Sequence, residues 1–306
     1  MAQKLLLDVD PGCDDAVALS VAAASPDIDL VGVSTVAGNT TIENTTRNAL
    51  AILEYVGADD VPVAKGCHRP LADELETAEW VHGPGGLRGD IPEPAGSPVA
   101  TTGPEFIVEQ AHEHGEALTI GAVGPLTNLA VALALEPALP ELVDDIYFMG
   151  GAAFVGGNTT PMAEFNMYND PPAGERIAQD ADARMVGLDV TNDGTLTAET
   201  IVDLGARSET LRTVATWLGY TDSLDESELE DNPSIHDAVV VADLLGDVLT
   251  FKEYYVEIDT TGGPSHGAVV CDRRGVMDEE PNTAVAVDID VERFREIVVD
   301  ALERFA

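Results

Sequence analysis

Basic residues are scarce in this chain, and lysine is the scarcest of them. The 306 residues include 15 Lys and Arg, of which three are lysines, against 56 Asp and Glu, so the formal net charge is −41. Nucleic acids and anionic membrane surfaces bind basic patches. We therefore expect neither of them as a partner.

The same acid excess indicates the salt conditions that suit the protein. A net charge of −41 lies far beyond the magnitude of ~2–8 suggested for a small soluble domain. Concentrated salt screens charges within a few ångströms and so weakens self-repulsion. We therefore predict a halophilic protein, and the alternative is an ordinary acidic cytosolic one. Disorder is excluded, because 45% of the residues are hydrophobic and fall into periodic runs.

Cysteines and long apolar runs are also few. Cys13, Cys67 and Cys271 are far apart and lack CxxC spacing, so neither a disulfide framework nor a zinc site is indicated. The first apolar run is only three leucines long, which is too short for a signal peptide, and no later run approaches the ~20 apolar residues of a membrane span. We expect a cytoplasmic protein without a membrane partner.

Apolar runs of strand length alternate with segments of helical periodicity. Strands are predicted at 5–7, 30–36, 118–123, 146–149, 185–188 and 283–288, and helices at 15–24, 42–56, 105–112, 129–135, 173–180, 238–245 and 291–305. This alternation predicts an α/β fold, a single domain over 1–306 with a mostly parallel sheet flanked by helices. Ligands of such folds bind beyond the carboxyl ends of the strands, where the polar motifs of this chain also fall.

Four carboxylates lie within eight residues at the end of the first predicted strand: Asp8, Asp10, Asp14 and Asp15. Capping of the following helix accounts for one of the last two but not for the whole set. Neighbouring negative charges repel one another unless hydrogen bonds, helix-terminal amides or a cation compensate them. A hard divalent cation, Ca²⁺ or Mg²⁺, fits such oxygen ligands better than zinc does.

Two further motifs carry polar side chains. Asn158, Glu164 and Asn166 follow the strand that ends at Met149, and their donors and acceptors suit a polyhydroxylated ligand, although Asn and Gly also build ordinary turns. His236 and Asp237 precede a predicted helix. They either cap that helix, or serve as a proton donor facing the substrate and a distant metal ligand.

The longest irregular stretches are 66–103 and 219–234. The second carries Asp222, Asp225, Glu226, Glu228, Glu230 and Asp231. A solvated acidic loop and a mobile lid remain alternative interpretations of it, since long loops in compact domains are often functional.

In these motifs the chain resembles the inosine-uridine-type nucleoside hydrolases. The matching elements run nearly the whole length in order: Asp8-Val9-Asp10-Pro11-Gly12-Cys13-Asp14-Asp15-Ala16, Thr35-Val36-Ala37-Gly38-Asn39, Thr46-Arg47-Asn48-Ala49, His82-Gly83, Val123-Gly124-Pro125-Leu126-Thr127-Asn128, Met149-Gly150-Gly151, Gly157-Asn158, Ala163-Glu164-Phe165-Asn166, Asp170-Pro171, Val186-Gly187-Leu188-Asp189-Val190-Thr191, His236-Asp237 and the tail Asp300-Ala301-Leu302-Glu303-Arg304. The resemblance implies a Ca²⁺-dependent enzyme of nucleoside salvage that hydrolyses the N-glycosidic bond of ribonucleosides and assembles as a homodimer or homotetramer.

The resemblance also implies a role for each matching residue. Asp10, Asp15 and Asp237 would bind calcium through carboxylates and Val123 through its carbonyl, and Asp10 would also be the general base toward a calcium-bound water. The ribose hydroxyls would be held by Asp14, Asn39, Asn158, Glu164 and Asn166. Met149 would pack near the sugar, His82 and His236 would lie near the departing nucleobase, and Asp8 would support the site from behind.

Two other functions compete with this one. Asp8 and Asp10 after an apolar strand also suit an aspartate-nucleophile phosphatase. Such sites need a lysine, however, and the chain has only three lysines, which weakens this alternative. A non-catalytic nucleoside-binding protein is the second alternative. It predicts loss of Asp10 or His236, and both are present.

Overall fold

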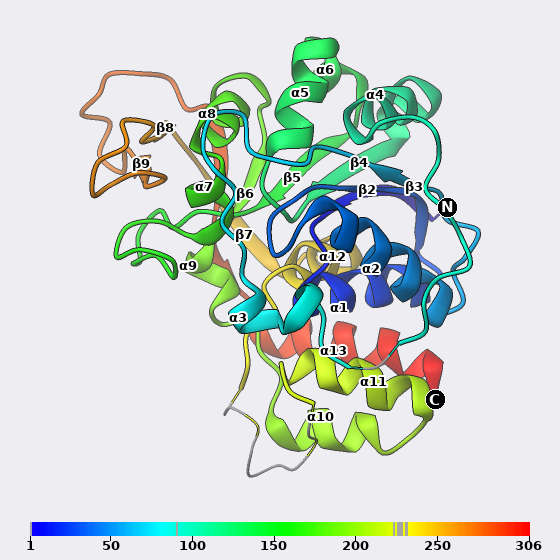
Figure 1. The fold of residues 1–306 in the computed structure, drawn as a ribbon. Helices are drawn as coiled ribbons and strands as arrows, with labels where there is room; N and C mark the ends of the chain where they lie inside the picture. The colour runs from blue at the N-terminus through cyan, green and yellow to red at the C-terminus, as the bar shows by residue number, and fades with distance from the viewer. Residues whose placement is uncertain (1, 90, 223, 225–228, 230–231) are drawn as a thin grey trace.

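A computed structural model describes residues 2–89, 91–222, 224, 229 and 232–306 of the chain (Figure 1). Its described residues form one central eight-stranded sheet in the order β3-β2-β1-β4-β5-β6-β10-β7, and all neighbouring strands are parallel except β10 and β7. The strands are β1 (Gln3–Val9), β2 (Ile28–Thr35), β3 (Val63–Lys65), β4 (Leu118–Ala122), β5 (Asp145–Met149), β6 (Arg184–Val186), β7 (Leu249–Tyr254) and β10 (Thr283–Ile289). The predicted single-domain α/β fold is confirmed.

Helices cover both faces of this sheet, as Figure 1 shows. One layer contains α1 (Cys13–Ala24), α2 (Ile42–Tyr55), α10 (Ala198–Gly205), α11 (Glu209–Leu218), α12 (Ala238–Gly246) and α13 (Val291–Leu302), and the other contains α4 (Gly103–His114), α5 (Thr127–Leu135), α6 (Leu139–Leu142) and α8 (Pro171–Asp180). Leu5 and Leu7 of β1 pack into the first layer and Leu6 into the second, because successive side chains of a strand point to opposite faces. A strand buried on both faces reads as a continuous apolar run, which is why β1 was visible in the sequence.

Most of the predicted elements are confirmed, and the differences lie at their ends. The strand predicted at 185–188 ends at Val186, and Leu188 begins the short helix α9 (Leu188–Thr191). The closing helix predicted at 291–305 ends at Leu302 and continues as a 3₁₀ turn over Glu303–Phe305. The short helices α3 (Glu79–His82) and α7 (Phe165–Asn169) and the separate hairpin of β8 (Val256–Ile258) and β9 (Val269–Cys271) were not predicted, and neither were α6, α10, α11, β3 and β7.

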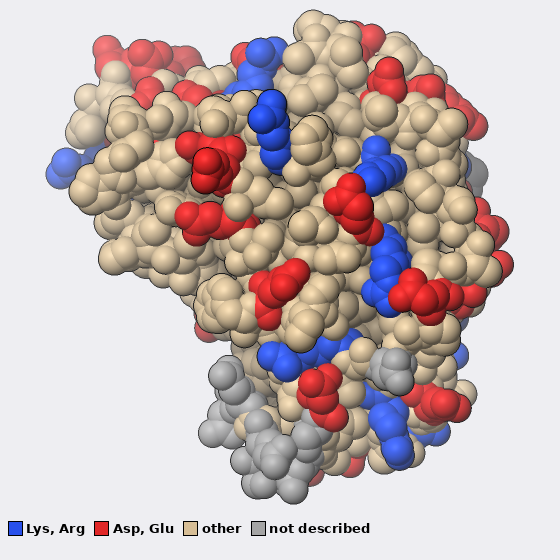
Figure 2. Space-filling view, in the orientation of Figure 1, with Lys and Arg blue, Asp and Glu red and all other residues tan. Residues whose placement is uncertain are grey.

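Two sequence expectations concern the surface. No helix of the described residues is long and apolar enough to cross a membrane. On the face drawn in Figure 2, acidic side chains are scattered and basic ones lie among them, so no continuous basic patch covers it. Lys4 and Lys65 pair with Asp29 and Glu43 at 2.9 and 3.0 Å. Seven residues of the acidic stretch 219–234, namely 223, 225–228 and 230–231, lie outside the described residues, so the solvated loop and the mobile lid both stay open as interpretations.

Candidate active site

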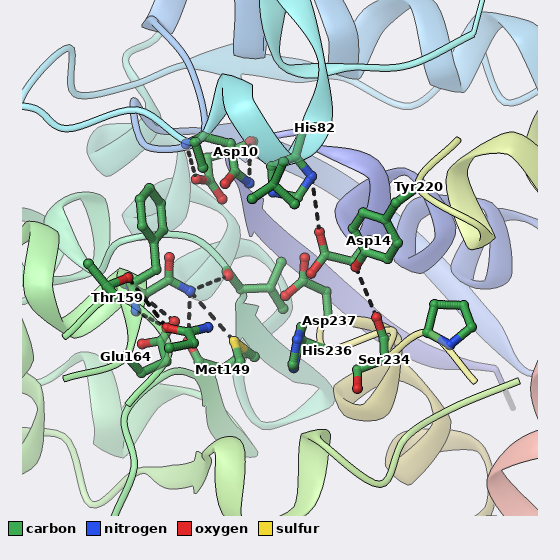
Figure 3. A pocket seen from close by; sticks show the side chains of 18 of the residues that line it. Asp10, Asp14, His82, Met149, Thr159, Glu164, Tyr220, Ser234, His236 and Asp237 are labelled. Atoms are coloured by element: carbon green, nitrogen blue, oxygen red, sulfur yellow. Dashed lines mark hydrogen bonds and ion pairs between the residues drawn. The ribbon is translucent and has the colours of Figure 1, made fainter. Parts of the chain in front are cut away.

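The predicted site residues meet at the carboxyl edge of the sheet, around one cavity of about 720 Å³ (Figure 3). Asp10 follows β1, Asn39 follows β2, Val123 follows β4, and Met149 ends β5. Every residue assigned a role in the site lines the cavity except Asp8 and Asp15: the lining includes Asp10, Asp14, Asn39, His82, Val123, Met149, Asn158, Glu164, Asn166, His236 and Asp237. The expectation that the polar motifs gather at one edge of the sheet is therefore confirmed.

The turn between β1 and α1 determines where the first carboxylates point. Asp15 accepts hydrogen bonds from the backbone N–H groups of Gly12 at 2.9 Å and Asp10 at 3.0 Å, so it caps α1. The carboxylate of Asp10 accepts a 2.6 Å hydrogen bond from the backbone N–H of Asn39, whose side-chain amide reaches Asp15 at 3.2 Å. The turn after β1 and the loop after β2 thus hold Asp10 and Asp15 in place.

Two glycines make room for the Asp10 carboxylate. A Cβ at Gly38 would lie 2.1 Å from Asp10 Oδ2, and a Cβ at Gly124 would lie 2.6 Å from Oδ1. These distances are far inside van der Waals contact. Only glycine fits at both positions while Asp10 keeps its place.

The carboxylates are buried together, which makes their ionisation costly. Burial raises the pKa of Asp8 to about 7 and that of Asp14 to about 6, and burial with repulsion from Asp14 raises the pKa of Asp15 to about 6. Burial is also the largest cause that raises the pKa values of Asp10 and Asp237 well above their usual range, with repulsion from neighbouring carboxylates adding to it. No Lys or Arg among the described residues forms an ion pair with any of these five groups.

This donor set fits a hard divalent cation. One carboxylate oxygen from each of Asp14, Asp15 and Asp237 lies within 4.8 Å of the other two. Asp14 Oδ1 is buried and has no hydrogen-bond partner among the described residues. Closely spaced carboxylate oxygens are the ligands that Ca²⁺ and Mg²⁺ prefer. The grouping contains Asp14 where the resemblance implied Asp10, and Val123 O accepts a 2.8 Å hydrogen bond from Asn166 Nδ2. The implied ligand set of Asp10, Asp15, Asp237 and Val123 stays a prediction.

Glu164 and Asn166 form the opposite wall of the cavity. Glu164 is the N-cap of α7 and accepts hydrogen bonds from the backbone N–H groups of Gly151, Asn166 and Met167 at 2.8–3.1 Å. Burial raises the pKa of Glu164. The Asn166 side chain donates to the carbonyls of Val123 and Met149 at 2.8 and 3.1 Å and thereby joins the ends of β4 and β5. Asn158 is exposed at the rim and accepts from Phe165 N.

Two histidines line the cavity near Asp14 and Asp237, as Figure 3 shows. His82 Nδ1 accepts a 3.1 Å hydrogen bond from the backbone N–H of Cys13. His236 Nδ1 lies 2.8 Å from Thr191 Oγ1. Burial lowers the pKa of each histidine to about 4. Both rings are therefore neutral near pH 7, and they can offer hydrogen bonds there rather than a full positive charge.

Several residues of the cavity were missed or given no role from the sequence. Arg88 is the single Lys or Arg that lines the cavity within the described residues, and its guanidinium donates to Val81 O. Tyr220, with a positive φ of 48°, donates to Ser234 O and lies 5.8 Å, ring to ring, from His82. Trp80 also lines the cavity. Thr191 lies in a motif of the resemblance but was given no role, since its contact with His236 joins segments 45 residues apart.

Comparison with known protein families gives a match over almost the whole chain. A family model described as inosine-uridine preferring nucleoside hydrolase matches residues 5–296. The chain is 37% identical to the pyrimidine-specific ribonucleoside hydrolase RihA of Shigella boydii serotype 4 and to RihA of Citrobacter koseri, with 100% of each chain covered.

Solved structures of nucleoside hydrolases match the fold over nearly the whole chain. The plant nucleoside hydrolase PpNRh1 matches with a TM-score of 0.89 and 29% identity over 99% of each chain. The purine-preferring ribonucleoside hydrolase of Gardnerella vaginalis matches with a TM-score of 0.89 and 29% identity over 98% of each chain. The cavity described above therefore lies in a fold that these hydrolases share.

Proposed function

Since the chain belongs to the inosine-uridine preferring nucleoside hydrolase family and is thus a hydrolase of N-glycosyl compounds, we propose that it cleaves ribonucleosides with a bound Ca²⁺ and with Asp10 as general base. The products are ribose and the free nucleobase. Aspartate-nucleophile phosphatase chemistry and non-catalytic binding, the two alternatives from the sequence, are set aside by this family membership.

The aspartate cluster holds the cation in this proposal. Its ligands are the carboxylates of Asp10, Asp15 and Asp237 and the carbonyl of Val123. When bound, a divalent cation supplies a fixed positive charge that positions the ribose 2′- and 3′-hydroxyls and an attacking water and makes that water more acidic. Asp10 is held by Asn39 N at 2.6 Å and lies between Gly38 and Gly124, which supports a fixed base that takes one proton from the water.

The ribose lies between the two walls of the cavity. Asp14 and Asn39 hold hydroxyls on the side of the aspartate cluster, while Asn158, Glu164 and Asn166 hold them on the other side. Met149 packs against the sugar. As the nucleobase departs, ribosyl C1′ becomes oxocarbenium-like, and the surrounding carboxylates stabilise its positive charge.

The nucleobase lies near the two histidines. His236, and with it His82, donates a hydrogen bond to the departing nucleobase, on which negative charge develops as the C1′–N bond breaks. The neutral state of both rings at pH 7, which follows from their lowered pKa values of about 4, supports this role. Identity of 37% over the full length of RihA supports a preference for pyrimidine nucleosides.

One observation carries the proposal: four buried carboxylates without a Lys or Arg partner among the described residues, Asp10, Asp14, Asp15 and Asp237, lie together beside polar groups suited to a sugar. The test is ribose release from uridine, cytidine, inosine, adenosine and guanosine in molar KCl, with calcium and with a chelator. We expect turnover with calcium, faster with uridine and cytidine, and its loss on chelation. Absence of ribose release from every nucleoside would contradict the proposal. Turnover that does not depend on calcium would contradict the proposed role of the cation.

A further inference from the structure

We propose that Thr191 is a positioning residue for this reaction. Its hydroxyl donates a hydrogen bond to His236 Nδ1 and so keeps the ring proton on Nε2, where Nε2–H can donate a hydrogen bond to the departing nucleobase. Thr191 Oγ1 lies 2.8 Å from His236 Nδ1, and Thr191 is fully buried at the end of α9. The inference rests on the proposed role of His236.

The direction of this hydrogen bond follows from the other partners of Thr191. Its backbone N–H donates to Gly187 O at 3.1 Å. Among the described residues, its hydroxyl has one partner, His236 Nδ1. If the hydroxyl accepted from Nδ1–H, its own proton would be buried without an acceptor, which is costly. A neutral imidazole carries one N–H, so a ring that accepts at Nδ1 donates at Nε2.

Backbone contacts fix the segment of His236 against the segment of Thr191. Ile235 N donates to Gly194 O at 2.8 Å, and Ser234 Oγ donates to Asn192 O at 3.0 Å. Thr195 and Ser234 form an isolated antiparallel bridge. The distance between Thr191 and His236 is therefore set by two paired stretches of chain rather than by one flexible side chain.

The helix that carries Thr191 is anchored in turn to the far wall of the cavity. Asp189, also in α9, accepts hydrogen bonds from the backbone N–H groups of Ala153 and Phe154 at 2.8 and 2.7 Å. Leu188 N donates to Gly151 O at 2.9 Å. The Gly151 amide also donates to Glu164. One turn thus positions both a ribose-side carboxylate and, through α9, the imidazole on the nucleobase side.

The chemistry that this arrangement serves is the departure of the nucleobase. The C1′–N bond breaks, its electron pair stays on the nucleobase, and Nε2–H stabilises the developing negative charge by a hydrogen bond. Water adds to C1′ and gives one proton to Asp10, and the nucleobase takes a proton from solvent after it leaves. Without the Thr191 hydroxyl, Nδ1 can keep the proton, and Nε2 then presents a lone pair to the leaving anion.

Two substrates separate positioning from a merely structural role. Uridine has a poor leaving group, whereas 4-nitrophenyl β-D-ribofuranoside releases a stable anion that needs no hydrogen bond. For Thr191→Val we expect kcat with uridine to fall about 10- to 100-fold, with KM within about twofold and kcat with the nitrophenyl riboside nearly unchanged. Thr191→Ser, which keeps the hydroxyl, restores uridine turnover.

Thr45→Val is the matched control, because Thr45 is a fully buried threonine of α2 whose hydroxyl donates to Ile42 O. It leaves both substrates unaffected. An equal loss of both substrates in Thr191→Val, or no loss with uridine, would overturn the inference. His236→Ala distinguishes failure of the proposed role of His236 from failure of the inference about Thr191. If this variant keeps full uridine turnover, the proposed role of His236 fails and the inference fails with it. If it loses that turnover while Thr191→Val does not, only the inference fails.

An NMR measurement on the wild-type protein tests the inference even if Thr191→Val does not fold. In protein labelled with ¹⁵N histidine, the His236 nitrogen shifts, assigned by their absence in His236→Asn, report which ring nitrogen carries the proton. We expect Nε2 to carry it. A proton on Nδ1 would overturn the inference.

Discussion

At the scale of single residues, the site depends on how tightly Asp10 is held. Its carboxylate accepts from Asn39 N at 2.6 Å, and Gly38 and Gly124 approach it so closely that a Cβ at either position would overlap it. A group fixed in this way needs no reorganisation when it takes a proton. Its chemistry and its position can therefore be tested separately.

Asp10→Asn tests the chemistry. The amide keeps the shape and an acceptor oxygen for Asn39 N but cannot take a proton from water, so we expect kcat with uridine to fall by about 10²- to 10⁴-fold. The measurement is ribose release under saturating uridine and calcium. Asp29→Asn, at a surface position paired with Lys4, serves as control. Near-normal turnover by Asp10→Asn would show that another group is the base.

Gly38→Ala tests the position. The added Cβ would lie 2.1 Å from Asp10 Oδ2, so the carboxylate or the loop must move, and a shift near 1 Å costs about 100-fold in kcat. Gly263→Ala is the matched control, because no atom lies within 4 Å of a Cβ there. Equal kcat values for the two variants would contradict the crowding of Asp10.

The sequence was sufficient for residues whose motif is local. Asp10, Asp14 and Asp15 share one turn, and Glu164 and Asn166 share another, so their spacing alone predicted that they act together. Thr191 and Tyr220 were given no role because their contacts, to His236 and His82, join segments far apart in the chain. A single sequence contains no signal for such pairings.

At the scale of elements, burial on both faces decided what could be predicted. β1, β4 and β5 are nearly continuous apolar runs, and each was found. β7 is an edge strand that alternates between exposed and half-buried residues, and it pairs antiparallel with β10. β3, β8 and β9 have three residues each, too few for a periodicity. Edge and short strands are defined by the strands they pair with, which the local pattern does not contain.

The closing helix α13 offers a test of an element. Asp290 caps it by accepting a 3.0 Å hydrogen bond from Arg293 N. We expect Asp290→Ala to lower the free energy of unfolding by about 1 kcal/mol, the usual cost of a lost N-cap. Urea unfolding in molar KCl measures it. Asp300→Ala, at an exposed position of the same helix, should leave stability unchanged or slightly higher. Equal stability of the two variants would exclude a capping role for Asp290.

At the scale of the whole molecule, the charge of −41 divides into two populations. The carboxylates of the site are buried, whereas the ion pairs of Lys4 and Lys65 and most other acids lie at the surface. The surface population predicts dependence on salt. We expect the melting temperature to rise from about 0.1 M to about 1 M KCl, since the Debye length falls from about 10 Å to about 3 Å. An osmotically matched sucrose series is the control, and an equal rise in both would contradict an electrostatic cause.

The buried population predicts how stability responds to pH without metal. In the unfolded chain these carboxyls ionise near 3.8, whereas in the folded protein the pKa of Asp8 is about 7 and those of Asp14 and Asp15 are about 6. The folded state therefore binds more protons, and its stability falls as pH rises through this window. His82 and His236 have the opposite effect. Their pKa values are lowered to about 4 in the folded protein from 6.5 in the unfolded chain, so they make stability rise with pH up to about 6.5.

Above that value the carboxyls dominate, so the melting temperature of the chelated protein should fall from about pH 6.5 to about 8.5. Calcium competes with protons for the same oxygens, so its stabilising effect should grow over the same range. Scanning calorimetry in molar KCl measures both. A melting temperature of the chelated protein that is independent of pH would contradict the raised pKa values.

The predicted halophilic and cytoplasmic setting and the homodimer or homotetramer stay predictions at this scale. They do not alter the central claim, which is calcium-dependent hydrolysis of ribonucleosides at the aspartate cluster. Its most direct test is a calcium titration of the chelated protein with uridine, with ribose and uracil measured together. The account predicts both products in equal amounts, at a rate that rises with calcium and saturates. Uridine left intact at saturating calcium would contradict it.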